Sequence, residues 1–286
     1  MKKPLISVII PLYNHAPYIE QNIESIVNQT YGFDNIELIV IDDCSTDKSV
    51  SVVKKLQEKF TFQLIINKIN KGICTNINHC LSISKGKYVC VTGSDDYWSL
   101  DKLELQTSFM ENNSSIAVCS GNAIRIDSES NNLPEKNQFK GPERTYDFKD
   151  IIMRDFPFSS TLAMIRKSVL DQVGPYDTTL KIEDYYMWLK ISHAGYALHL
   201  LENNIGFYRI HNSNTIKNVM LIYKEIRKII DLYKKEQLYS KAIRRLKIVY
   251  FPQIALTNKF EAIRLLPQAV SNTRFFYRGL FNLFKF

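Results

Sequence analysis

The 286-residue chain has few glycines and prolines and neither of the two common glycine-rich phosphate motifs. It contains 10 Gly and 9 Pro, too few for a repetitive or low-complexity protein. No GxGxxG and no GxxxxGK[ST] segment occurs, so the chain lacks the phosphate-binding backbone of dinucleotide-dependent dehydrogenases and of P-loop NTPases. Any nucleotide phosphate has to be held by other groups.

Cysteine pairs and long apolar runs are also missing. The five cysteines, at positions 44, 74, 80, 90 and 119, form no CxxC spacing, which predicts a reduced, intracellular protein without disulfides. We expect Cys74 and Cys80 to lie in the core. The N-terminal apolar run meets Pro11 and Asn14 too early for a signal peptide. Because no run of about 18 uncharged apolar residues occurs, we expect no membrane-spanning helix.

Acidic residues are scarce in the C-terminal quarter of the chain. Residues 211–286 have 15 Lys+Arg and 4 Asp+Glu, a net charge of +11, whereas residues 1–210 have 22 and 25, a net charge of −3. A protein that binds nucleic acid more often spreads its basic residues over the domain that contacts the nucleic acid. The split therefore predicts a slightly acidic body with a basic appendage, and no nucleic-acid partner.

Apolar runs alternate with amphipathic segments along the first 120 residues. Continuous rather than alternating apolarity is typical of parallel strands covered by helices on both faces. The predicted strands are 5–10, 36–41, 62–66 and 88–91, and the predicted helices are about 16–29, 47–59, 72–83 and 100–110. Further along, we expect a loop or hairpin over 127–144, a strand over 160–165, a short helix from Lys167 and a stronger helix over 183–193.

Four polar clusters follow the predicted parallel strands. They are residues 11–14 (PLYN), 42–47 (DDCSTD), 70–72 (NKG) and 94–98 (SDDYW). The carboxyl ends of parallel strands meet at one edge of a sheet, where helix N-termini point toward bound ligands. We therefore expect a ligand site at this edge. An Asp-rich turn is more often a helix N-cap, and that is the favoured role for Asp47.

The adjacent carboxylates of Asp95 and Asp96 indicate a metal site at the same edge. They are hard oxygen ligands suited to Mg²⁺ or Mn²⁺, which usually share their coordination with substrate phosphates. Because the chain has no glycine-rich phosphate loop, these residues predict a diphosphate bridged by a metal ion.

Taken in order, the motifs resemble those of a glycosyltransferase family. The segments that look like family 2 inverting glycosyltransferases are IPLYN, ESIVNQT at 24–30, IDDCSTD, NKGI, SDDYW, Glu183-Asp184 with Trp188, and YRIH at 208–211. The resemblance covers residues 5 to about 215. It implies the GT-A fold of nucleotide-diphospho-sugar transferases, an α/β fold with a mostly parallel central sheet flanked by helices. It further implies a transferase domain over 1–215, with a basic helical C-terminal extension over 216–286.

The resemblance implies roles for residues of the strand-end loops. Asp43 would accept an N–H of the nucleobase. Asp95 and Asp96 stand where the family has its DXD-type motif, with Asp96 binding the metal and Asp95 near the ribose, although which carboxylate contacts the metal stays open. The implied nucleotide-binding residues are Pro11, Tyr13, Asn14, Asp43, Gly72 and Asp95.

Glu183 and Asp184 resemble the ED motif of the family, whose aspartate is the general base. Inversion is a single in-line displacement, so one carboxylate must take the proton of the acceptor hydroxyl while the diphosphate leaves from the opposite face. The resemblance thus implies Asp184 as the catalytic base, with Glu183 beside it. The alternative is that both acids begin a helix and favour its dipole, and both roles can hold together.

His211 and Arg209 complete the implied site. His211 matches a late histidine that approaches the metal or the diphosphate, and the alternative is a structural histidine. Arg209 would neutralise charge on the leaving diphosphate, and the alternative is a surface salt bridge. The remaining histidines show no paired spacing typical of metal ligands: His15, His79, His193 and His199.

The basic extension has two parts. From about 218 to 250, apolar and basic residues recur at helical spacing, which predicts a helix that packs on the domain with a solvated face. Residues 273–286 (TRFFYRGLFNLFKF) interleave aromatic and basic side chains, a pattern that fits a helix lying in an anionic membrane surface. The alternative for this segment is packing against the core or in a homodimer.

The residues and the resemblance together predict a metal-dependent inverting glycosyltransferase. The expected donor is a UDP-sugar and the expected cofactor is Mn²⁺ or Mg²⁺. The expected acceptor is a surface glycan such as capsule, O-antigen or lipooligosaccharide, carried on a lipid at the inner face of a bacterial membrane. One alternative is a catalytically silent nucleotide-sugar-binding scaffold. Another is a sugar nucleotidyltransferase, which would have a glycine-rich loop after the first strand, and IPLYNHAPY has no glycine.

Overall fold

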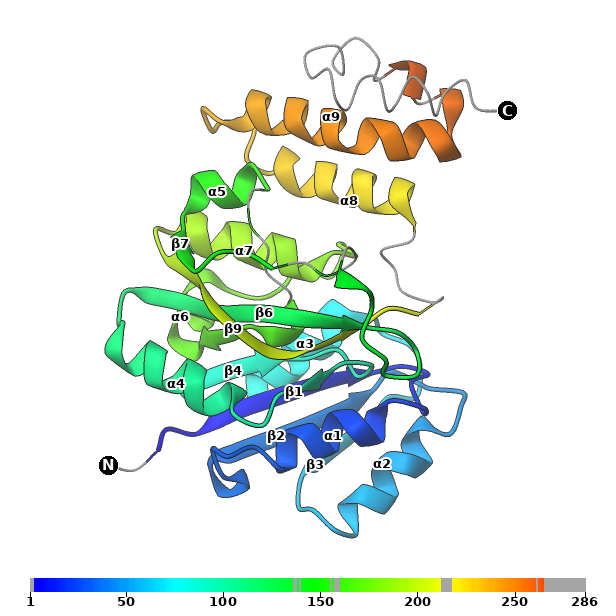
Figure 1. The fold of residues 1–286 in the computed structure, drawn as a ribbon, viewed down its shortest axis with the longest axis vertical. Helices are drawn as coiled ribbons and strands as arrows, with labels where there is room; N and C mark the ends of the chain where they lie inside the picture. Colours follow the sequence, from blue (N-terminus) through cyan, green and yellow to red (C-terminus); the bar gives the residue numbers. More distant parts are fainter. Residues whose placement is uncertain are drawn as a thin grey trace. The chain divides into compact units, whose positions relative to one another are not determined.

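A computed structural model describes residues 3–135, 138, 140–154, 156, 160–211, 218–260 and 262–264 (Figure 1). The chain forms two compact units. The first consists of Met1–Phe148 and Phe156–His211, and the second of Lys149–Asp155 and Asn212–Phe286. The predicted domain boundary, between 215 and 216, lies outside the described residues, so that division stays a prediction.

The first four strands form what we call the parallel half of the sheet. They are β1 (Ile6–Leu12), β2 (Ile36–Asp42), β3 (Gln63–Ile66) and β4 (Tyr88–Val91). Their order is β3-β2-β1-β4, and each neighbouring pair is parallel. The connecting helices are α1 (Ile19–Val27), α2 (Ser49–Gln57) and α3 (Ile73–Ile83). Leu12 pairs with Asp42, so β1 and β2 end side by side.

The other five strands form the mixed half. They are β5 (Tyr97–Trp98), β6 (Ile116–Ile126), β7 (Arg144–Tyr146), β8 (Met164–Arg166) and β9 (Ala197–Arg209). The sheet continues from β4 as β8-β6-β9-β5, and β7 pairs with β9. Strands β6 and β9 are parallel, whereas β8, β5 and β7 run antiparallel to their neighbours. The helices here are α4 (Lys102–Asn112), α5 (Phe148–Ile152), α6 (Lys167–Val173) and α7 (Glu183–His193).

Most of the elements predicted from the sequence are present. The strand over 88–91 and the helix over 183–193 have the predicted bounds, and the other predicted strands and helices of the first 120 residues differ by a few residues at their ends. All five cysteines are free, and Cys74 and Cys80 are buried as predicted. The α/β sheet flanked by helices is confirmed, with a larger antiparallel share than expected because three short strands pair inside the mixed half.

The strand predicted over 160–165 is wrong in its first part. Ser160–Leu162 form a short 3-10 helix, and the strand covers Met164–Arg166. Thr161 explains the difference, because its hydroxyl oxygen lies 2.8 Å from that of Thr92 and accepts the N–H of Gly93 at 3.1 Å. This segment therefore turns toward the end of β4 instead of continuing a ladder.

The two longest strands, β6 and β9, were missing from the sequence predictions. Each has polar residues in its middle, Ser120-Gly121-Asn122 in β6 and Glu202-Asn203-Asn204 in β9. The pairing between them shifts register at Gly121/Asn122 and again at Asn122/Ala123. Bulges of this kind interrupt the regular alternation by which a strand is recognised in a sequence.

The second unit contains α8 (Val219–Asp231) and α9 (Tyr239–Thr257), which pack against each other. The Asn218 side chain accepts the N–H of Leu221 and so caps α8. The described part of the chain has no helix that is both long and apolar enough to cross a membrane. The segment 273–286, for which we predict membrane contact, lies outside the described residues.

Candidate active site

The loop after β1 is tied to the loop after β2 by a single side chain. Asn14 has φ +53°, in the left-handed region. Its Oδ1 accepts the Thr46 N–H at 2.8 Å, and its own N–H donates to Ser45 Oγ at 2.9 Å. Asn14 therefore lies at the predicted edge, but its side-chain oxygen already binds the neighbouring loop. Tyr13, in contrast, is 47% exposed.

Asp47 binds the start of α2 but is not its N-cap residue, which is Lys48, one position later. One carboxylate oxygen accepts the N–H of Ser49, the first residue of α2, and the other accepts the N–H of Ala16. Asp47 thus holds the start of a helix and the loop after β1 together.

Asp43 is 5% exposed and binds the loop that precedes α3. Its Oδ1 accepts the Lys71 N–H at 2.7 Å, and its Oδ2 accepts the Gly72 N–H at 2.9 Å. Burial alone would raise the pKa of Asp43, but hydrogen bonds from Asn76, Lys71 and Gly72 outweigh it and lower that pKa. Asp43 is therefore a carboxylate at neutral pH. Its bond to a nucleobase stays a prediction, as do the nucleotide contacts of Pro11, Tyr13, Asn14 and Gly72.

The turn after β4 is held from both sides. Asn22 of α1 donates through Nδ2 to the carbonyl oxygens of Gly93 and Asp96, at 2.9 and 2.8 Å. A Cβ added to Gly93 would lie 2.8 Å from Asp95 Oδ1 and 3.1 Å from Asp96 Oδ2, so this position has room only for glycine unless the carboxylates move. The two aspartates are therefore fixed by their surroundings, and they differ in exposure.

Asp96 is buried within the protein, 3% exposed. Its Oδ1 accepts the backbone N–H of Arg209 at 2.7 Å. Burial first, and the neighbouring Asp95 carboxylate second, raise the pKa of Asp96. This oxygen of Asp96 thus binds the protein itself, and the role of Asp96 as a metal ligand stays a prediction.

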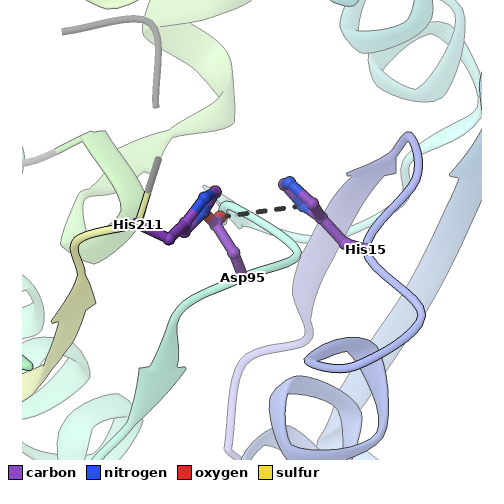
Figure 2. A group of neighbouring side chains, drawn as sticks. All are labelled: His15, Asp95 and His211. Atoms are coloured by element: carbon purple, nitrogen blue, oxygen red, sulfur yellow. Dashed lines mark hydrogen bonds and ion pairs between the residues drawn. The ribbon is translucent and has the colours of Figure 1, made fainter. Parts of the chain in front are cut away.

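Asp95 instead faces two histidines, and we call this group the His-Asp-His cluster (Figure 2). One ligand atom each of His15, Asp95 and His211 lies within 4.8 Å of the other two. His211 Nε2 is 2.8 Å from Asp95 Oδ2, and His15 Nδ1 is 4.0 Å from Asp95 Oδ1. Burial lowers the pKa of His15, which favours the neutral ring that binds a cation. Two imidazoles and a carboxylate fit a divalent transition metal.

Arg209, at the end of β9, is 1% exposed, so the alternative of a surface salt bridge is wrong. Its Nε donates to the carbonyl oxygen of Asp95, and its two terminal nitrogens donate to the loop after β6 and to Gln21. The guanidinium carbon also lies 4.7 Å from the centre of the Tyr18 ring. Arg209 thus joins the aspartate turn to α1. Its contact with a diphosphate stays a prediction.

Glu183 and Asp184 form the first turn of α7. Burial and the Asp184 carboxylate raise the pKa of Glu183 to about 8. Burial first, and then the carboxylates of Asp96, Asp95 and Asp184, raise the pKa of the Tyr208 hydroxyl. Both acids lie in the first turn of a helix, where they favour its dipole, as the structural alternative predicted. The catalytic role of Asp184 stays a prediction.

Sequence reasoning missed two residues that the structure brings to this edge. His15 follows the PLYN loop directly, and its position after β1 was the available signal. Tyr208 precedes Arg209 in YRIH, and no pattern in the sequence places it beside carboxylates that are 24 and 112 positions away.

The fold and the site define a class of protein, the nucleotide-sugar transferases. A family model described as "Glycosyl transferase family 2" matches residues 7–174. This match covers more than half of the chain, so the chain belongs to glycosyltransferase family 2. The predicted family and the predicted enzyme class are confirmed.

Relatives and solved structures agree with this assignment. An uncharacterized glycosyltransferase of Methanocaldococcus jannaschii is 30% identical over 245 residues, 84% of this chain and 78% of that protein. The Escherichia coli UDP-Glc:α-D-GlcNAc-diphosphoundecaprenol β-1,3-glucosyltransferase WfaP is 30% identical over 214 residues, 75% of this chain and 80% of that protein.

Among solved structures, Staphylococcus aureus TarS 1–349 in complex with UDP-GlcNAc aligns with a TM-score of 0.72 at 20% identity, over 98% of this chain and 89% of that chain. The mannosyltransferase PcManGT of Pyrobaculum calidifontis, in complex with GDP-Man and Mn²⁺, aligns with a TM-score of 0.67 at 16% identity, over 99% of this chain and 85% of that chain. These likenesses confirm the predicted GT-A fold.

Proposed function

We propose that this enzyme transfers a sugar, with inversion, from a UDP-sugar to a hydroxyl of a lipid-linked surface glycan in a metal-dependent reaction. The observation that carries the proposal is the His-Asp-His cluster, in which one ligand atom each of His15, Asp95 and His211 lies within 4.8 Å of the other two. This cluster offers a cation site for the donor diphosphate at the edge of the sheet where the family binds its donor.

Asp184 takes the proton of the acceptor hydroxyl in this proposal. The raised pKa of Glu183, about 8, leaves Glu183 largely protonated at pH 7. We therefore assign the role of the base to Asp184 and not to Glu183. A carboxylate of this kind, within hydrogen-bond reach of the acceptor, increases the nucleophilicity of the oxygen as it attacks the sugar carbon.

The cation is held by the His-Asp-His cluster, with Asp96 of the DXD-type motif as the further predicted ligand. A bound Mn²⁺ or Mg²⁺ supplies positive charge to the leaving diphosphate. Mn²⁺ accompanies a nucleotide sugar in the complex of PcManGT, whose fold this chain shares. Arg209 acts here chiefly by fixing the aspartate turn, since it donates to the carbonyl oxygen of Asp95.

The proposal of a UDP-sugar donor rests on the names of the relatives. WfaP is named for a UDP-Glc donor, and the TarS complex contains UDP-GlcNAc. In this chain the exposed ring of Tyr13, beside the end of β1, offers a face on which a base can stack.

The acceptor and its location follow from a relative and from the charge of the extension. WfaP is named for an acceptor carried on diphosphoundecaprenol. A lipid-linked acceptor requires the enzyme to work at a membrane surface. The net charge of +11 over residues 211–286 attracts anionic lipids. We therefore place the enzyme in the cytoplasm, peripheral to the inner face of the cell membrane.

Binding and transfer can be tested together on the full chain. Calorimetry with UDP, GDP and TDP, each with and without Mn²⁺, should give metal-dependent binding of UDP, and Asp96→Ala should weaken it. Transfer of radiolabelled sugar from UDP-sugars to a lipid-linked acceptor should then depend on Asp184. Donor binding without turnover in any acceptor assay would instead favour the silent scaffold, and absence of nucleotide binding would contradict the proposal.

The membrane contact is tested separately. Deletion of residues 272–286 should reduce co-flotation with vesicles that contain anionic lipid, and vesicles of neutral lipid serve as the control. A truncated chain that floats as well as the full chain would show that this segment does not make the membrane contact, and it would favour packing of the segment in the core or in a homodimer.

A further inference from the structure

We propose that His15 is a protein ligand of the catalytic cation, so that two imidazole nitrogens join the Asp95 carboxylate oxygen in the metal site and the site prefers Mn²⁺ to Mg²⁺. The inference rests on the proposed function for the purpose of the site. It adds a ligand and a metal preference that neither the DXD-type motif nor the late histidine implies.

The first argument is the place of His15. In the view of Figure 2 the Asp95 carboxylate lies between the ring of His15 and the ring of His211. The two imidazoles are in edge contact, with ring centres 5.6 Å apart and planes at 86°. Their ligand atoms and that of Asp95 lie within 4.8 Å of one another. Ligands at about 2.1 Å from a cation need only small side-chain rotations from this arrangement.

The second argument is that both rings are held in place before any cation binds. The N–H of His15 donates to Ser49 Oγ at 3.0 Å, and its carbonyl oxygen accepts the N–H groups of Tyr18 and Ile19. The Tyr18 ring then stacks on His211, with centres 5.4 Å apart. A positioned ligand loses little conformational entropy on metal binding, so the loop after β1 is built to present His15 to the cluster.

The third argument is the partner of His15 Nδ1. That atom lies 2.7 Å from Ser94 Oγ, the residue directly before Asp95. A serine hydroxyl can donate to a neutral imidazole and can turn away when a cation takes the nitrogen. The contact keeps the ring directed at the aspartate turn, and it does not bury a charge that a cation would have to displace.

The donor set determines the metal preference. Mg²⁺ is a hard cation that is usually bound by carboxylates, phosphates and water. Imidazole is a softer ligand that favours divalent first-row transition metals over Mg²⁺, and Mn²⁺ is the member of that series that also suits carboxylates. A site with Asp95 alone would bind both ions in a similar way. Two imidazoles shift the metal preference of the site toward Mn²⁺. One imidazole lies on the loop after β1 and the other follows β9, so the cation would join three segments that are far apart in the chain.

The test measures Mn²⁺ binding to the full chain by electron paramagnetic resonance, without nucleotide. His15→Ala should weaken Mn²⁺ binding at least about tenfold, since even loss of a group behind a ligand has this effect. The exposed His79 of α3 gives the control, because His79→Ala removes a histidine that is not a member of the cluster. Equal Mn²⁺ affinity of the two variants would overturn the proposal.

Pulsed measurements supply a second readout that does not depend on affinity. Mn²⁺ bound to the wild-type protein should show ¹⁴N couplings from two imidazoles, and Mn²⁺ bound to His15→Gln should show the coupling of one imidazole. Thermal unfolding checks that the variant is folded. Retention of both couplings in His15→Gln would contradict the assignment. His15→Asp should lower the preference for Mn²⁺ over Mg²⁺ by about tenfold, and an unchanged preference would also contradict it.

The outcomes distinguish this inference from the proposed function. If the wild-type enzyme transfers sugar with Mn²⁺ while His15→Gln keeps both couplings, only the ligand assignment fails. If His15 binds Mn²⁺ but no nucleotide binds, the metal site stands and the proposed function fails.

Discussion

The two halves of the sheet contribute to the site in different ways. In the parallel half, backbone N–H groups join the loops after β1, β2 and β3: the Thr46 N–H donates to Asn14 Oδ1, and the Lys71 N–H donates to the buried Asp43 carboxylate. Where the mixed half meets the turn after β4, two charged residues are buried together, since Asp96 and Arg209 are 3% and 1% exposed and Asp96 Oδ1 accepts the Arg209 N–H. A buried charge costs much more to leave unpartnered than a neutral group at the surface.

The difference also separates the expected tasks. The loops of the parallel half are predicted to bind the nucleotide through residues that follow β1, β2 and β3. The mixed half contains Glu183 and Asp184, in the first turn of α7, and Tyr208, near the end of β9. Changes in the mixed half should therefore alter turnover or folding strongly, and changes in the parallel half should alter affinity modestly.

The largest effect should come from Asp184→Asn. Loss of a general base costs about 10²–10⁴-fold in rate, and the amide retains the size of the side chain, so kcat should fall by this factor while UDP affinity stays within about twofold. Steady-state kinetics and calorimetry measure the two quantities. Asp171→Asn is the matched control, because Asp171 pairs with Lys167 at the surface of α6. Turnover near that of the control would remove Asp184 as the base.

The next effect concerns folding. Arg209→Met removes the charged donors to Asp95, to Gln21 and to the loop after β6. We expect the free energy of unfolding to fall by about 3–5 kcal/mol, the scale found when one member of a buried charged group is removed. Urea unfolding measures it. Lys167→Met, which breaks an exposed pair on a helix, should cost less than about 1 kcal/mol, and similar costs for both variants would contradict the comparison.

The same contrast explains what the sequence allowed us to predict. In the parallel half each apolar run ends in a polar cluster, so β1–β4 and the loops that follow them could be placed from the pattern alone. The strands β6 and β9 could not, because polar residues and register shifts interrupt them. For the same reason the meeting of His15 with Asp95 depends on packing across the sheet, and no spacing in the chain encodes it.

A third prediction concerns the pH dependence of stability. The pKa of Glu183 is about 8 in the folded chain and near 4.5 as its ordinary value. Between these values the folded state binds more protons than the unfolded state, so this group's contribution to stability is present below pH 4.5 and is lost as pH rises through 8. Glu183→Gln should remove that loss, which is less than about 5 kcal/mol.

Thermal unfolding from pH 5 to 9 measures this effect. The midpoint of the wild-type chain should decline more steeply with pH than that of Glu183→Gln, and the two curves should diverge toward pH 9. Glu111→Gln is a useful control. Hydrogen bonds from Lys87 and Tyr88 lower the pKa of Glu111 below its ordinary 4.5, so its contribution is lost only in more acidic solution and this variant should keep the wild-type slope from pH 5 to 9. Parallel curves for the wild type and Glu183→Gln would show that Glu183 is ionised at neutral pH.

The smallest effect should come from the parallel half. Asn14→Ala removes the acceptor for the Thr46 N–H and puts a residue with a Cβ but no side-chain acceptor at φ +53°. We expect a loss of about 1–2 kcal/mol of stability and a few-fold weaker binding of UDP.

Asn14→Gly separates backbone strain from the lost hydrogen bond, since glycine adopts positive φ without strain but makes no side-chain hydrogen bond. If both variants lose the same UDP affinity, the hydrogen bond to the β2 loop positions the nucleotide site. A loss as large as that of Arg209→Met would mean that the two halves depend on equally costly contacts.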